Sequence, residues 1–145
     1  MEYLRARCAE QLPAGMGVGD LQGFLFENLK PYEDTPEDIL RGLEHSLCAE
    51  NMGFVLTAIE EGRLIGVTVV LDTGMGGYVP ANLLLFVAVL SSRRGEGIGR
   101  ELLEQAIGKC EGGIKLHVEY ENPAKRLYER AGFSSKYAEM RHPGT

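Results

Sequence analysis

The sequence predicts one α/β domain, residues 1–145, in which a mixed, largely antiparallel sheet of about six or seven strands is flanked by helices. Its 145 residues suit a single domain with its own core, and 44% hydrophobic with 25% charged residues are globular proportions. Segments with the two-residue period of strands alternate with segments that have the 3.6-residue period of helices. The continuous apolar run from Leu83 to Leu90 indicates a central strand covered on both faces.

The N-terminal third of the chain predicts one strand and two helices. Apolar and polar residues alternate over 3–8, which is the pattern of a half-buried strand. Apolar residues then recur at helical spacing over 21–29. A second helix begins after Thr35, because Pro36 suits the first helical position and Asp38 completes a capping-box pattern.

The rest of the chain predicts a hairpin followed by alternating strands and helices. Its expected elements are strands at 54–59, 63–71 and 83–90, a helix at about 97–109, a strand at 114–119, a helix at 123–132 and a last strand at 135–140. The resulting order is β-α-α-β-β-β-α-β-α-β. Such an order favours a sheet covered by helices over a sandwich or a helical bundle.

Composition excludes several classes of protein. Three cysteines that lie far apart form neither a disulfide framework nor a Cys-x-x-Cys pair, so we expect no metal site and a reducing, cytoplasmic location. A net charge of −6 argues against nucleic-acid binding. The longest apolar run falls short of the roughly 20 residues of a membrane helix, and the first residues carry no secretory signal, so we expect no membrane partner.

A glycine turn, Arg94 to Gly99, links the apolar strand directly to the helix that follows. The first N–H groups of a helix lack partners, and the helix dipole adds about half a positive charge there. The three glycines let this backbone approach an anion closely, and Arg93, Arg94 and Arg100 add cationic donors nearby. The pattern therefore predicts a phosphate-binding site, although its spacing is not that of a P-loop.

Two other interpretations of the glycine turn stay open on spacing alone. Gly95-x-Gly97-x-Gly99 is one residue short of the dinucleotide fingerprint Gly-x-Gly-x-x-Gly, and the following strand ends in an acid, Glu119, as a ribose-binding strand can. Too little chain follows to build a doubly wound sheet, which disfavours a nucleotide-binding oxidoreductase fragment. The glycines could also serve only to make a tight turn between strand and helix.

Two motifs together resemble the general control N-acetyltransferase (GNAT) superfamily. Arg94-x-x-Gly97-x-Gly99, after a strand that ends in Val89, matches its signature Arg/Gln-x-x-Gly-x-Gly/Ala. Ala124-x-x-Leu127-Tyr128-Glu129-x-x-Gly132-Phe133 resembles its C-terminal helix, so the resemblance covers about Phe54 to Phe133. It implies the acyl-CoA N-acyltransferase fold and an enzyme that moves an acetyl group from acetyl-CoA to a primary amine by direct attack. The acceptor that the resemblance implies is an amine on a small molecule or on a protein.

The resemblance also implies roles for individual residues. The central strand splays from its neighbour and exposes backbone groups for the pantetheine amides and an oxyanion, while Tyr128 acts on the leaving thiolate. The cofactor-binding residues that it implies are Val87, Ala88, Val89, Arg94, Gly95, Glu96, Gly97, Ile98, Gly99, Arg100 and Asn122. Of these, Glu96 is expected to face solvent. Asn122 either contacts the pantetheine arm or caps a helix.

The sequence specifies neither the general base nor the amine acceptor. Glu119 could take the proton directly or through water, whereas packing or surface roles suit His117 and Cys110 better. The N-terminal helices and the loop 72–81 are expected to shape the acceptor site, and a homodimer is common among similar proteins. The alternative function is a catalytically silent acyl-CoA-binding or regulatory module that keeps the glycine turn without productive chemistry.

Overall fold

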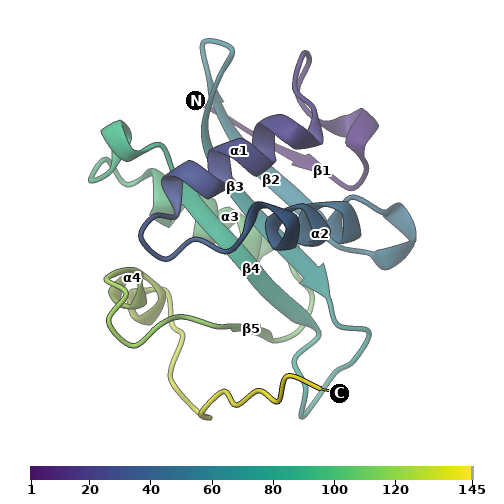
Figure 1. Ribbon diagram of the computed structural model, residues 1–145, viewed down its shortest axis with the longest axis vertical. Helices are drawn as coiled ribbons and strands as arrows, with labels where there is room; N and C mark the ends of the chain where they lie inside the picture. Colours follow the sequence, from purple (N-terminus) through teal and green to yellow (C-terminus); the bar gives the residue numbers. More distant parts are fainter. Residues whose placement is uncertain (145) are drawn as a thin grey trace.

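The computed structural model describes residues 1–144 and contains a five-stranded sheet whose strands follow the chain order (Figure 1). The strands are β1 (Glu2–Ala6), β2 (Phe54–Glu60), β3 (Arg63–Asp72), β4 (Asn82–Val89) and β5 (Ile114–Leu116). Neighbours from β1 to β4 pair antiparallel, whereas β5 runs parallel to β4. The predicted mixed, largely antiparallel sheet is confirmed, with fewer strands than expected.

Two predictions at the C-terminal end of the sheet were wrong. β5 ends at Leu116, so residues 117–119 leave the sheet, and 135–140 form no strand in the described chain. Residues 134–144 are exposed throughout. Alternation in this segment therefore has no apolar face to bury, and nothing offsets the entropy of ordering it as a strand.

Helices cover both faces of the sheet (Figure 1). They are α1 (Val18–Asn28), α2 (Pro36–Ser46), α3 (Ile98–Lys109) and α4 (Ala124–Arg130), with short 3₁₀ turns at Ala9–Gln11, Ala49–Asn51 and Ser91–Arg93. One core cluster joins α1 and α2 to Val55, Val67 and Val69, and the other joins α3 to Leu56 and Val70. The two clusters lie on opposite faces because successive strand residues point to opposite sides. None of the described helices is long and apolar enough to cross a membrane.

The start of α2 is capped as the sequence predicts. The Asp38 N–H donates to Thr35 Oγ1 over 3.1 Å, and Pro36 occupies the first turn. Loss of a Thr cap typically costs about 1 kcal/mol. We therefore expect Thr35→Ala to lower the free energy of unfolding by about that amount in urea titrations, and Thr35→Ser to lower it by less. Equal stability of the alanine variant and the wild type would contradict this assignment.

The junction between β4 and β5 positions the site. Parallel pairing joins Asn82–Leu84 to Ile114–Leu116 and then stops, at the point where a register shift leaves Leu85 unpaired with β3. Beyond it, β4 continues to Val89 beside β3 alone. A bulge bends a strand and strengthens its twist, so the two parallel strands diverge and leave one edge of β4 uncovered.

Candidate active site

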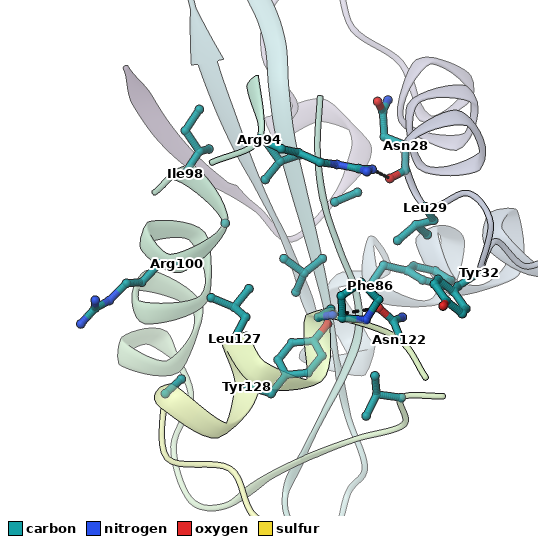
Figure 2. Close-up of a pocket in the computed structure, with 18 of the residues that line it drawn as sticks. Asn28, Leu29, Tyr32, Phe86, Arg94, Ile98, Arg100, Asn122, Leu127 and Tyr128 are labelled. Carbon is teal, nitrogen blue, oxygen red and sulfur yellow. Dashed lines mark hydrogen bonds between the residues drawn. The ribbon is translucent and has the colours of Figure 1, made fainter. Parts of the chain in front are cut away.

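A cleft of about 630 Å³ opens beside this uncovered edge. Its walls come from the end of α1 with the loop after it, from β4, from the glycine turn with the start of α3, and from the segment between His117 and α4 (Figure 2). Of the residues predicted to bind cofactor or to act in catalysis, all but Glu96 line the cleft. Segments far apart in the sequence thus converge on one cavity.

Backbone groups of β4 form the floor of the cleft. Leu90 N–H donates to Ile65 C=O over 2.8 Å, and Val89 and Val87 lie one and three residues before it in the same antiparallel ladder. Because alternate residues of such a ladder bond to the partner strand, Val87 and Val89 direct their N–H and C=O groups away from β3 and toward the cleft. Ala88 directs its N–H and C=O groups to β3, so only its side chain contributes to the lining of the cleft.

The glycine turn places the beginning of α3 at one end of the cleft. Gly95 and Gly97 both have φ of +83°, a conformation that side chains disfavour, and Gly97 is the N-cap of α3. A Cβ at Gly99 would lie 3.5 Å from Val89 Cγ2 and 3.6 Å from Leu127 Cδ2, between the two walls. The turn therefore presents the unpaired N–H groups of a twelve-residue helix to the cavity without a side chain in the way.

The arginines around the turn already have partners. Arg93 donates to Glu60 over 2.6 Å and to Glu96 over 3.0 Å. Glu96 is exposed, as expected, and pairs with Arg93 outside the cleft lining. Arg100 pairs with Glu104 over 2.9 Å, but its side chain is 70% exposed. Such a surface pair is weak, so Arg100 can turn to an anion at less cost than Arg93 can.

Tyr128 lies on α4, in the wall of the cleft formed by the C-terminal segment. A Schellman arrangement ends this helix: Phe133 N–H donates to Tyr128 C=O over 3.0 Å, and Gly132 N–H donates to Glu129 C=O over 3.1 Å. The Phe133 ring then packs edge-on against the Tyr128 ring, with centroids 6.1 Å apart. Burial, and next the charge of Glu119, raise the pKa of Tyr128 to about 12. The phenol therefore keeps its proton at neutral pH.

Two further titratable groups, His117 and Asp34, line the cleft together with Tyr128. Burial and the nearby Lys115 lower the pKa of His117, whose Nδ1 lies 3.3 Å from a guanidinium nitrogen of Arg141. Because arginine can only donate, Nδ1 accepts and the proton of neutral His117 sits on Nε2. Burial and the carboxylates of Asp38 and Glu119 raise the pKa of Asp34, which lines the facing wall.

Asn122 lies two residues before the start of α4 and lines the cleft. Its Oδ1 accepts from Ala124 N–H over 2.9 Å, and its Nδ2 donates to Glu119 Oε1 over 3.1 Å. The first of these bonds holds the N–H of the first residue of α4, whose N-cap is Pro123. The second bond fixes the side chain of Glu119, which lies beyond the end of β5 and not within it.

Sequence reasoning did not single out Asn28 or Tyr32, although both line the cleft. Tyr32 Oη donates to Glu121 C=O over 3.2 Å and so joins two walls. Neither residue belongs to a motif, and only their place at the end of a predicted helix could have drawn attention. The loop 72–81 was expected to shape the acceptor site, but none of its described residues lines this cleft. Burial raises the pKa of Cys110 to about 11, which makes it a poor nucleophile.

Similar solved structures share the whole fold. A probable acetyltransferase aligns with TM-score 0.73 and 18% identity over 100% of this chain and 99% of its own. A ribosomal-protein-alanine N-acetyltransferase from Brucella melitensis biovar Abortus 2308 aligns with TM-score 0.69 and 14% identity over 99% and 100%. An aminoglycoside N-acetyltransferase in complex with CoA gives TM-score 0.69 and 14% identity over 99% and 95%. No curated protein matches the sequence.

A family model described as the acetyltransferase (GNAT) domain matches residues 51–135. The matched segment contains the uncovered edge of β4, the glycine turn and α4, and it spans more than half of the chain. Together with the shared fold, this match shows that the chain belongs to the GNAT acetyltransferase family.

Proposed function

We propose that this protein transfers an acetyl group from acetyl-CoA to a primary amine by direct attack. One observation carries the proposal: Val87 and Val89 direct unpaired backbone groups into a cleft that also holds the glycine turn at one end and Tyr128 on one wall. Buried backbone groups without partners are costly. A ligand rich in amide and phosphate groups would satisfy them.

The residues fit the parts of CoA in order along the cleft. The N–H groups at the start of α3, within Gly97–Arg100, suit the pyrophosphate, with Arg100 as an added cation. Val87 and Val89 suit the pantetheine amides, and one of their N–H groups would also stabilise negative charge that develops on the acetyl oxygen. Tyr128 would donate a hydrogen bond to the departing sulfur.

The attacking amine must lose a proton. A lysine-like amine is neutral at pH 7 in about one molecule per few thousand, so a nearby acceptor for that proton assists the reaction. Glu119 is the residue we favour, acting directly or through water, because its side chain is held by Asn122 beside Tyr128. His117 is less suited, because Arg141 occupies the Nδ1 lone pair.

Binding of acetyl-CoA should stabilise the fold. At a free concentration one hundred times its Kd, the gain is about 2.7 kcal/mol, or a rise in Tm of roughly 8 °C for a domain of this size. Thermal melts with acetyl-CoA, and with NAD as the control ligand, measure it. An unchanged Tm in millimolar acetyl-CoA, with no heat of binding, would remove the proposal, and a shift with NAD alone would favour the oxidoreductase alternative.

A catalytically silent acyl-CoA-binding module would show the same melt. Turnover separates the two functions, because each transfer releases one free thiol from acetyl-CoA. We expect thiol release that depends on an amine when a panel of diamines, amino acids, aminoglycosides and lysine peptides is offered. Tight binding of acetyl-CoA without amine-dependent release across such a panel would favour the silent module.

A further inference from the structure

A buried amide at the end of α1 ties the acceptor side of the cleft to the glycine turn. Asn28, the last residue of α1, is only 7% exposed. Its Nδ2 donates to Phe24 C=O over 2.9 Å, and its Oδ1 accepts from Ser91 N–H over 3.0 Å. These two bonds fix the orientation of the amide, because one partner is an acceptor and the other a donor.

A second bond joins the same two segments, and again the 91–94 segment donates and Asn28 accepts. Arg94 Nη2 donates to Asn28 C=O over 2.5 Å (Figure 2). That carbonyl is one of the last of α1, which have no partner inside the helix, and the negative end of the helix dipole favours a cation there. Asn28 thus accepts from Ser91 through its side-chain oxygen and from Arg94 through its main-chain oxygen, across more than sixty residues of sequence.

The loop that follows Asn28 lines the cleft opposite α4. Residues 29–32 and Asp34 belong to this wall, and Tyr32 fastens it to Glu121 on the far side. Any shift of Asn28 relative to the glycine turn would move this loop relative to the cofactor end. The geometry points to Asn28 as a positioning residue. Through Ser91 and Arg94 it fixes the position of the loop 29–34, on the acceptor side of the cleft, relative to the glycine turn.

This inference rests on the proposed function, since the turn is the expected CoA site. It adds that the Arg94 side chain mainly holds the wall formed by the loop 29–34, and contributes less to phosphate binding. Removal of the Arg94 side chain should therefore leave the salt dependence of CoA binding nearly unchanged. A side chain that neutralises phosphate contributes to that dependence, whereas one that only holds two protein segments together does not. The loop 29–34 should instead lose protection from amide exchange.

The test compares CoA affinity and stability in four proteins: wild type, Asn28→Leu, Asn28→Asp and Gln22→Ala. Asn28→Leu removes the bond to Ser91, and we expect Kd for CoA to rise about tenfold. Asn28→Asp keeps an acceptor for Ser91 N–H but turns an oxygen toward Phe24 C=O, so stability falls while Kd stays within about threefold of wild type. Gln22 Nε2 donates to Pro36 C=O over 2.8 Å and joins α1 to α2 without touching the turn. Gln22→Ala should therefore lose stability and keep the wild-type Kd.

Hydrogen exchange supplies a readout that does not depend on the folding of Asn28→Leu. Arg94 is exposed, so Arg94→Met removes one link without burying a group. We expect CoA to protect residues 29–34 in the wild type and to protect them several-fold less in Arg94→Met. Wild-type Kd in Asn28→Leu, or equal protection of 29–34 in Arg94→Met, would overturn the inference. Failure of the wild type to bind CoA would instead remove the proposed function, and the inference with it.

Discussion

Replacement of Tyr128 by Phe should lower kcat by about 100-fold and leave the Kd for acetyl-CoA nearly unchanged. The ring keeps its edge-on contact with Phe133 and loses only the hydroxyl. A phenol with a pKa of about 12 is a weaker acid than a thiol near 8.5, so complete transfer to the thiolate is uphill by roughly 5 kcal/mol. Tyr128 is therefore expected to donate a hydrogen bond that becomes proton transfer late in the step.

The pH profile gives the second part of this prediction. Only the protonated phenol can donate, and the raised pKa places its ionisation near pH 12. We expect wild-type kcat to hold through pH 10, where an ordinary tyrosine is already half ionised. The matched control is Tyr120→Phe, since Tyr120 is 81% exposed on the segment before α4. If Tyr128→Phe turns over as fast as Tyr120→Phe, Tyr128 is a packing residue.

Gly99→Val should raise the Kd for CoA at least about 100-fold, because it would cost two or more charge-assisted hydrogen bonds to phosphate. An added Cβ meets Val89 and Leu127 at ordinary contact distances, so the protein should still fold, while the two methyl groups beyond it enter the cleft. Gly97→Val should also abolish binding, with added strain from φ of +83°. Arg94→Ala should raise the Kd for CoA by less than either valine variant.

Gly108→Val is the control for the helix itself. Gly108 lies on α3 like Gly99, but a Cβ there meets nothing within 4 Å, and the residue is outside the cleft. Both variants change the helix propensity in the same way. Calorimetry should then give the wild-type Kd for Gly108→Val. Equal affinities in the two valine variants would mean that Gly99 serves only the geometry of the turn.

Local sequence signals predicted most of the fold because each was supported by burial. The apolar face of α3 and the cap of α2 are examples, since both depend on neighbours a few residues away. The extra strand at 135–140 failed because its alternation had no apolar face behind it. A two-residue alternation shows that a segment is able to form a strand. The strand forms only where a neighbouring surface buries its apolar face.

The site divides in the same way. The glycine turn and Tyr128 belong to contiguous motifs, so the sequence predicts them. Asn28 and Tyr32 reach the cleft through contacts with segments more than sixty residues away, and one sequence does not record such contacts. Glu96, which the motif includes and which was expected to face solvent, is exposed and pairs with Arg93 outside the cleft lining.

The parallel junction of β4 and β5 has a consequence for how the molecule opens. It consists of three residue pairs, and none of the described residues of α4 is fully buried. The wall that carries Tyr128 is therefore held by few contacts, and its local opening costs much less than unfolding of the antiparallel meander. Opening of this wall would widen the cleft while β1 to β4 stay paired, so the divergence of β4 and β5 that forms the cleft is also where we expect the fold to open first.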